Sequence, residues 1–527
     1  MKPHRSPLPL GRRSLLSTTL AVLLGSLLPL HTTPTAAAAP DATLEVVAPW
    51  EINGLQPASS GFVFQRMQVA ETLVEVDHEG ALTGGLAQRW QVSDDGLQWR
   101  FTLRAGARFH DGQPVTAQAV LPSLKAARID PAALSLAPVE RIEAPDAQTV
   151  LIVLKHRHAA LPALLAHSST IILSPTSFDA DGKVRKLVAT GPFEIESVTP
   201  PQQMRVRRFA RYDGQQPAIA RAHYLAAGRA ETRALMAESG QADLAFTLDP
   251  ASLQRIRGRK ALTVLSTTLP RTTILKLNAG LPGLKDERVR QALSLAIDRK
   301  GIATALLRDP GLAASQLFPP DMPAWHDAGL APLRFDLPAA ERLLADAGWK
   351  KDEAGTLRNG AGEALTLTIS TFPDRPELPQ IATALQAQWR RLGIAVKVDI
   401  GNSGDIPLKH RDGSLQVGLA ARNYGNVADP IGAIAQDFSP QGGDWGAMNW
   451  HDTTLDKAID GLLTGTLDNQ ASQTARRLVG QVLQQQLPVV PVSWYRQQLV
   501  VGRRVSGASI DPLERSYRLT DLQWRQP

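Results

Sequence analysis

Residues 86–120 constrain the fold more than any other stretch, because turn signals alternate there with strand-like spacing. Asp94-Asp95-Gly96 predicts a tight turn, since a glycine can adopt the positive φ that a hairpin requires. Apolar and polar residues then alternate along residues 97–104, a pattern that predicts a strand with one buried face. Thr116 is placed to cap a helix that follows. We therefore predict that this stretch is structural, a hairpin followed by a helix.

The order of residues in this stretch is also specific: residues 90–117 read W-x-V-S-D-D-G-L-x-W-x-F-x-L-R-x-G-x-x-F-H-D-G-x-P-x-T-A. This text resembles the signature of the family 5 solute-binding proteins of ABC importers, the peptide and nickel group. A second match, D-E-R-V-R-Q-A-L-S-L-A-I-D-R at residues 286–299, also has the spacing of an amphipathic helix. Two shorter matches are G-P-F at residues 191–193 and P-V-V-P at residues 488–491. The resemblance extends over residues 43–501.

The resemblance implies an α/β, two-lobed periplasmic solute-binding protein fold of the type II or cluster C kind. In this fold a ligand cleft lies between two lobes that are joined by a hinge of two chain crossings. Alternating helix and strand patterns agree with an α/β class, and 527 residues are too many for one core. We predict a first lobe from residues 40–269 and 488–527, with an added subdomain, and a second lobe from residues 270–487. Residues 62–74 of the first lobe have the spacing of a helix.

Residues 1–39 are predicted to be an export signal peptide. Basic residues, including the Arg12-Arg13 pair, precede an apolar run at residues 15–30, and alanines at residues 36–39 offer a cleavage site. A membrane anchor is the weaker alternative, because the run is shorter than the roughly 20 apolar residues that a span needs. The arginine pair fits a twin-arginine motif as well as an ordinary signal, so the export route stays open. The chain has no cysteine, which excludes disulfides and a lipid-bearing cysteine; we predict a periplasmic protein without a lipid anchor.

Neither composition nor motifs favour nucleic-acid binding or catalysis. Removal of the four basic residues of the predicted signal reduces the formal net charge from +7 to +3. A charge this small does not indicate a nucleic-acid-binding protein. GxSxG, HExxH and P-loop motifs are absent from the sequence, so we predict no enzyme, no catalytic residues and no cofactor. His156 and His158 have no cysteine or carboxylate cluster nearby, and we predict no metal site there. His110-Asp111 lies in a turn that itself explains these residue types.

The predicted ligand site is residues 421–430, A-R-N-Y-G-N-V-A-D-P, which resembles the family segment that leads into the cleft and ends in Asp-Pro. Arg422 can pair a ligand carboxylate in a forked bond, and Tyr424 offers an apolar face with a polar tip. Asn426 can donate and accept hydrogen bonds, and Asp429 fixes the turn. Dipeptide-binding members usually carry an Asp at the position of Asn426, whereas an aromatic at the position of Tyr424 looks more like the nickel branch. An exposed loop is the alternative interpretation of Arg422 and Tyr424.

Two further ligand-binding candidates are Trp445, next to a glycine pair, and Arg496, just after the return crossing. The resemblance implies the periplasmic substrate-binding component of an ABC importer, a monomer that captures a peptide-sized solute. Its partners would be that small-molecule ligand, a peptide or a metal chelate, and the permease subunits in the inner membrane. A nickel or other metal-chelate binding protein of the same family is the alternative, and an exported hydrolase is a distant one. Sequence does not separate an importer component from a ligand sensor on the same fold.

Overall fold

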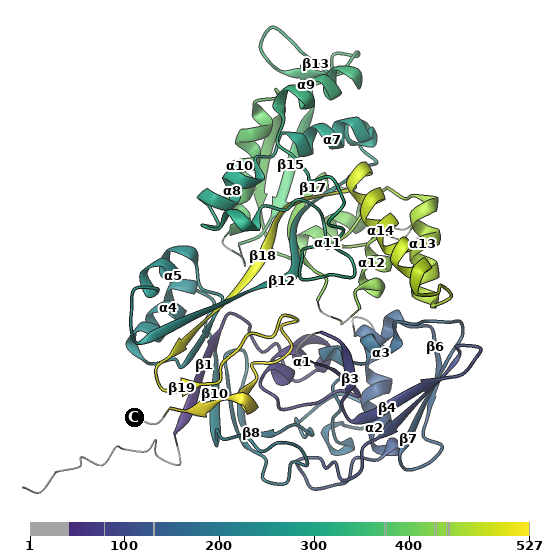
Figure 1. The fold of residues 1–527 in the computed structure, drawn as a ribbon, viewed down its shortest axis with the longest axis vertical. Coiled ribbons are helices and arrows are strands. Elements are labelled where there is room, and N and C mark those ends of the chain that lie inside the picture. Colours follow the sequence, from purple (N-terminus) through teal and green to yellow (C-terminus); the bar gives the residue numbers. More distant parts are fainter. Residues whose placement is uncertain are drawn as a thin grey trace, which may run out of the picture.

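Two lobes joined by two long strands make up the part of the chain that the computed structural model describes, residues 42–77, 80–129, 132–373, 375, 377–425, 427, 429–438, 440 and 443–525. The joining strands are β12 (Leu262–Leu277) and β18 (Val489–Gly502), which run side by side from one lobe to the other (Figure 1). The predicted two-lobed α/β fold is confirmed. The predicted signal peptide, residues 1–39, lies outside the described residues.

One ten-stranded sheet runs through both lobes, because β12 and β18 are its central strands. Each lobe contributes the strands on one side of this pair. In sheet order the strands are β16 (Ala395–Ile400), β15 (Thr366–Thr371), β17 (Val417–Asn423), β12, β18, β11 (Leu244–Phe246), β1 (Thr43–Ala48), β10 (Arg221–Ala226), β9 (Gln203–Arg208) and β8 (Phe193–Thr199). Strand β17 leads directly into the predicted ligand segment, because its last residues, through Asn423, belong to residues 421–430.

The pairing of β12 with β18 is irregular where the lobes meet. Its register shifts between Leu269 and Thr272 and again between Thr273 and Ile274. Pro270 lies in the first irregular step, and a proline has no N–H to give to a neighbouring strand. Irregular pairing bends a strand locally, so the sheet changes direction at this level.

A four-stranded antiparallel sheet forms a separate part of the first lobe. Its strands are β4 (Ala87–Val92), β5 (Gln98–Leu103), β7 (Thr149–Leu154) and β6 (Val139–Glu143). The predicted hairpin is confirmed, since Gly96 has a φ of 71° between β4 and β5. The predicted cap is confirmed as well: the Thr116 hydroxyl accepts a hydrogen bond from the Ala119 N–H at 3.2 Å, where α2 (Ala117–Ala126) begins.

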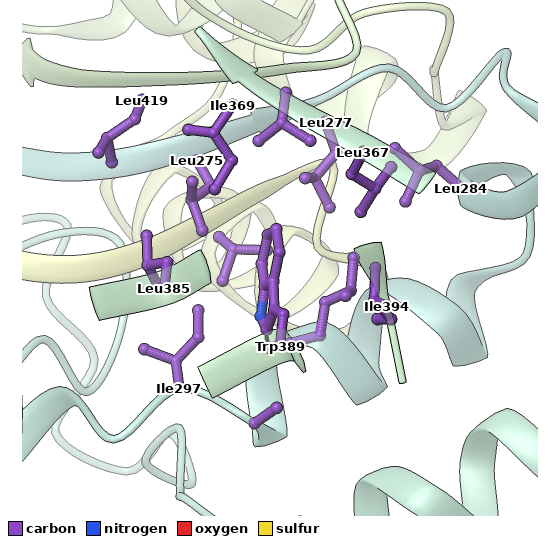
Figure 2. Packing of buried hydrophobic residues seen from close by; sticks show 14 of the residues in the cluster. Leu275, Leu277, Leu284, Ile297, Leu367, Ile369, Leu385, Trp389, Ile394 and Leu419 are labelled. Carbon is purple, nitrogen blue, oxygen red and sulfur yellow. Dashed lines mark hydrogen bonds between the residues drawn. The ribbon is translucent and has the colours of Figure 1, made fainter. Parts of the chain in front are cut away.

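Helices of the second lobe pack around Trp389, which is completely buried. Its indole N–H donates to the carbonyl of Leu293 at 3.0 Å, so the one polar atom of the ring is satisfied. Figure 2 shows aliphatic side chains of both sheet and helices around this ring. The helices that contribute to this cluster are α6 (Pro282–Lys285), α7 (Glu287–Leu295), α8 (Arg299–Ala305), α9 (Leu337–Asp346), α10 (Glu377–Arg390) and α11 (Asp405–Arg411). A second cluster contains buried residues of α12 (Ile431–Phe438), α13 (Thr453–Thr464) and α14 (Asn469–Gln486).

Two predicted helices differ from the structure. The helix expected over residues 286–299 ends at Leu295, because the Asp298 carboxylate accepts a hydrogen bond from the Gly301 N–H and starts α8 instead. The helix expected over residues 62–74 is wrong in both bounds. Helix α1 (Pro57–Arg66) starts with a proline, which suits the first turn, and the chain leaves it at Gln68 with a φ of 54°.

The remaining elements are short. They are β2 (Val74–Val76), β3 (Leu82–Gly84), α3 (Leu161–Leu164), α4 (Ala230–Ser239), α5 (Pro250–Ile256), β13 (Lys350–Lys351), β14 (Leu357–Arg358), β19 (Val505–Ser506) and β20 (Gln523–Trp524). Among the described residues, no helix combines the length and apolar character that crossing a membrane would require.

Candidate ligand site between the lobes

The lobes touch at the end of their interface that is far from the joining strands. The N–H of Ala159 donates to the carbonyl of Leu463 at 2.8 Å. Ala160 packs into a buried cluster whose other members lie at residues 274–489, and Val427 packs into the cluster of the four-stranded part. Each lobe therefore places a residue in the core of the other, and the structure shows the lobes closed on each other.

A cluster of three arginines, one tyrosine and one glutamate lies at the opposite end, beside the joining strands. Tyr495 of β18 has the guanidinium carbons of Arg271 and Arg375 each 4.9 Å from its ring centre. Arg271 donates to the carboxylate of Glu514, which comes from the C-terminal segment. Arg66, the last residue of α1, donates through Nε to the backbone carbonyl of Glu514 at 2.7 Å. Five segments of the chain thus converge on one small region.

The cluster carries more positive than negative charge. Burial alone would raise the pKa of the Glu514 carboxyl, but Arg271, Arg66 and Arg375 outweigh it and hold this pKa below its usual value. Burial raises the pKa of the Tyr495 hydroxyl, although the ring and Arg375 are only half-buried. An excess of buried guanidinium groups favours an anionic group beside them.

Arg422 of β17 has a partner within its own lobe. Its Nε and Nη2 donate to the two carboxylate oxygens of Asp437 at 2.6 and 2.9 Å, in the forked geometry expected for a ligand carboxylate. Both side chains are largely buried, with 13% and 2% of their surface exposed. The exposed-loop interpretation of Arg422 is therefore wrong. Its predicted ligand contact stays a prediction, for which a ligand would have to compete with Asp437.

Tyr424 is buried as well, with 1% of its surface exposed, so the exposed-loop interpretation is wrong here too. Its ring packs edge-on against Phe318 at 5.3 Å. Asp429 accepts a hydrogen bond from the Ile431 N–H at 3.0 Å and thereby shapes the start of α12. Burial raises the pKa of the Asp429 carboxyl. Asn426 lies outside the described residues, so its predicted hydrogen bonds stay predictions.

The two further candidates have different neighbours, and Arg496 is part of β18 itself. Trp445 is half-buried and packs edge-on against Phe372 at 6.5 Å. Its loop is held by the buried Lys276, whose ammonium donates to the carbonyls of residues 443 and 444. Arg496 forms an ion pair with Asp309. Their contacts with a ligand stay predictions.

His110 and Asp111 have structural partners, which confirms the interpretation of this pair as part of a turn. The His110 ring donates through Nε2 to the carbonyl of Gly191 at 2.9 Å. The Asp111 carboxylate accepts from the hydroxyls of Ser174 and Thr176 at 2.8 and 2.9 Å. With these bonds both residues join the turn to the neighbouring loop.

A cavity of about 260 Å³ lies beside the cluster in the first lobe, bounded by residues 65–77 and by the C-terminal segment. Glu71 lines it, and its carboxylate accepts hydrogen bonds from Arg104 at 3.0 Å and from the Tyr212 hydroxyl at 3.2 Å. Burial raises the pKa of Glu71 to about 7 in spite of the Arg104 charge. Arg515 lines the cavity too and is paired with Glu75 at 2.7 Å.

The sequence prediction missed Arg66, Arg375 and Glu514. They are separated by more than a hundred residues each, and none stands in a recognisable motif. Arg271 could have been identified from the sequence, because it follows Pro270 at the predicted crossing between the lobes. A basic residue at the crossing is the one signal in the sequence that pointed to this cluster.

Comparisons with known proteins agree with this architecture. The model of the bacterial extracellular solute-binding proteins, family 5 Middle, matches residues 81–445. The nickel-binding periplasmic protein of Escherichia coli (strain K12) is 26% identical over 88% of this chain and 91% of its own length. The probable D,D-dipeptide-binding periplasmic protein DdpA of the same strain is 26% identical over 82% of both chains.

Among solved structures, NikA from Brucella suis in complex with Fe(III)-EDTA has a TM-score of 0.83 at 22% identity, covering 92% of this chain and all of that one. A nickel ABC transporter structure from Bacillus halodurans has a TM-score of 0.74 at 24% identity, covering 91% and 99%. These likenesses concern the fold. Because the family model matches well over half of its length, this chain belongs to family 5 of the bacterial extracellular solute-binding proteins.

Proposed function

We propose that this chain is the periplasmic solute-binding component of an ABC importer of the peptide and nickel group. In this role it captures a peptide-sized solute between its lobes and delivers the solute to the permease in the inner membrane. Membership in family 5 is the observation that carries this proposal. The family consists of bacterial extracellular solute-binding proteins, and the Escherichia coli relative is a nickel-binding periplasmic protein. The export signal, the absence of a lipid anchor and the monomeric state belong to the same proposal.

The lobes that would enclose the solute are residues 40–269 with 488–527, and residues 270–487. The irregular pairing of β12 and β18 at Leu269 and Thr272 supports a boundary at this level. Opening at this bend would part the contact of Ala159 with Leu463, and a bound solute would favour the closed form. The permease then meets mainly loaded protein. Capture, closure, docking and release involve no covalent step.

A metal chelate is the second candidate for the solute. The excess of arginine side chains around Tyr495 suits a ligand with several carboxylates, and the Brucella suis relative is in complex with Fe(III)-EDTA. In that case the metal is cargo inside the chelate. The chain itself would recognise the chelate's carboxylates.

Native mass spectrometry of the mature protein from its periplasm tests both candidates, with metal analysis of the same sample before and after mild denaturation. A released mass that fits a short peptide, without metal, supports peptide import. Stoichiometric transition metal with a small chelator supports the alternative. A sample that releases no solute and binds none of the compounds in a peptide and chelate panel contradicts the proposal.

The Arg375→Gln variant locates the site. Loss of one guanidinium from the cluster should lower solute occupancy about tenfold or more, because charged hydrogen bonds to a buried anion are strong. Arg141→Gln is the matched control, since Arg141 is half exposed on the four-stranded part and pairs with Glu143 there. Equal occupancy in both variants would place the solute elsewhere.

A further inference from the structure

The ion pair of Arg271 with Glu514 is incomplete. Nη2 of Arg271 donates to Oε2 of Glu514, whereas Nε of Arg271 and Oε1 of Glu514 have no hydrogen-bond partner among the described residues. Both side chains are almost fully buried, with 7% and 4% of their surface exposed. Arginine and carboxylate commonly form two parallel bonds, and buried polar atoms are rarely left unpaired. One donor of Arg271 and one acceptor of Glu514 therefore remain unpaired among the described residues.

The backbone holds Glu514 in place at a conformational cost. Its φ is 56°, in the left-handed region that side chains other than glycine seldom adopt. The Asp511 carboxylate accepts hydrogen bonds from the N–H groups of Leu513, Arg515 and Ser516 at 2.9, 3.0 and 2.9 Å. These bonds fix the turn that carries Glu514. The position of the carboxylate is therefore determined by the segment around it.

The pair lies directly beneath the wall of the proposed cleft. Asn423 is the register partner of Arg271 in the sheet and donates to Oε2 of Glu514 at 3.5 Å. Asn423, Tyr495 and Arg375 are half-buried. Asn423 and Arg375 belong to the proposed second lobe and Glu514 to the first, so the proposed opening of the lobes would uncover the pair.

We propose that Glu514 is a specificity-determining residue that, with Arg271, selects solutes carrying an ammonium group beside a carboxylate. The ammonium group would donate to Oε1 of Glu514, and the carboxylate would accept from Nε of Arg271 and from Arg375. Free amino acids, short peptides and amino-acid chelates share this chemistry. The inference rests on the proposed function and adds the charge pattern of its solute.

Simpler charge patterns fit the cluster less well. A solute with carboxylates alone would bring one of them against Glu514, whose pKa the surrounding arginines keep low. A solute with only positive charge would meet Arg66, Arg271 and Arg375. A zwitterionic group can bond to the unpaired Nε of Arg271 and to the unpaired Oε1 of Glu514 together, which neither alternative can do.

Calorimetric titration of the refolded, solute-free mature chain tests the inference. The probes are dialanine, L-histidine, L-histidine with Ni²⁺, the N-acetylated form of each amino compound, and citrate. We expect the wild type to bind an amino probe about tenfold or more tightly than its N-acetylated form. In Glu514→Gln, which keeps the side-chain volume, this ratio should fall close to one. Dialanine against the two histidine probes distinguishes a peptide from a free amino acid and from a chelate.

The control is Glu75→Gln. It removes a carboxylate that pairs with Arg515, the residue after Glu514, and it should leave the ratio of amino-probe to N-acetyl-probe affinity unchanged. Circular dichroism and thermal unfolding of both variants exclude a loss of fold as the cause. An unchanged ratio in Glu514→Gln, or a wild type that binds citrate but no amino probe, overturns the inference. A wild type that binds no probe and releases no solute in native mass spectrometry contradicts the proposed function instead.

Discussion

Gly465 faces Ala159 across the contact between the lobes, and a Cβ added to Gly465 would lie 2.8 Å from the Cβ of Ala159. Gly465 follows α13 with a φ of 66°, a left-handed conformation that glycine adopts without cost. The backbone bond from Ala159 to Leu463 lies beside it. A small residue at this position is thus part of how the lobes close.

Gly465→Ala should disfavour the closed form, because the added methyl group overlaps Ala159 only when the lobes touch. We expect solute affinity to fall about fivefold to tenfold, since overpacking of this kind costs on the order of 1 kcal/mol. Small-angle scattering with saturating solute should show a larger radius of gyration. Gly480→Ala in α14 is the control: no atom lies within 4 Å of its added Cβ, and it should stabilise the helix. Unchanged affinity and shape in Gly465→Ala would contradict this account of closure.

Stability should depend on pH through three histidines, His110, His158 and His167. Burial lowers the pKa of each to about 4 in the folded chain. In the unfolded chain their pKa is about 6.5, so between about pH 4 and 6.5 unfolding takes up protons. The contribution of these histidines to the free energy of unfolding therefore rises with pH across this window and is lost as the pH falls. Each histidine contributes up to about 1.4 kcal/mol per pH unit, measurable by urea unfolding at several pH values.

His167→Asn isolates one of these contributions. The Asn oxygen can replace Nδ1 of His167, which accepts a hydrogen bond from the Ser169 N–H at 3.1 Å. The slope of unfolding free energy against pH should then decrease by up to about 1.4 kcal/mol per pH unit, the contribution of one such group. A slope equal to that of the wild type would show that His167 takes up its proton elsewhere in the pH range.

Asp437→Asn should be strongly destabilising, because it leaves the Arg422 guanidinium buried without its countercharge. Breaking a buried pair in this way costs about 3 kcal/mol or more, which chemical denaturation measures directly. The double variant Arg422→Met, Asp437→Leu should recover most of the loss, since both charges are gone.

The same double variant tests the predicted ligand contact of Arg422. If this side chain binds the solute carboxylate, the refolded double variant will be stable but will bind the solute weakly. Wild-type affinity in a stable double variant would assign Arg422 to the structure of the second lobe alone.

Local chemistry made the scaffold predictable. Gly96 and Thr116 act on residues a few positions away, so their roles could be inferred from the neighbouring sequence and were confirmed. The end of α1 was not predictable in this way. Apolar spacing continues past Arg66, and only the packing of the first lobe determines that the chain turns at Gln68.

The candidate site was predictable only in part, for the same physical reason. Arg422 and Tyr424 stand in a segment with a recognisable pattern, but burial and the pairing with Asp437 depend on how α12 packs against β17. The pairing of Arg271 with Glu514 joins residues 243 positions apart. Sequence spacing carries no information about a contact of that kind until the topology is known.

The place of β18 in the sheet also determines when the chain can finish folding during synthesis. β18 separates β12 from β11, so without it the ten-stranded sheet is two unconnected pieces. Ribosomes deliver residues 489–502 after every other strand of this sheet. A chain that lacks them therefore cannot complete its largest sheet, however much of the rest has been made.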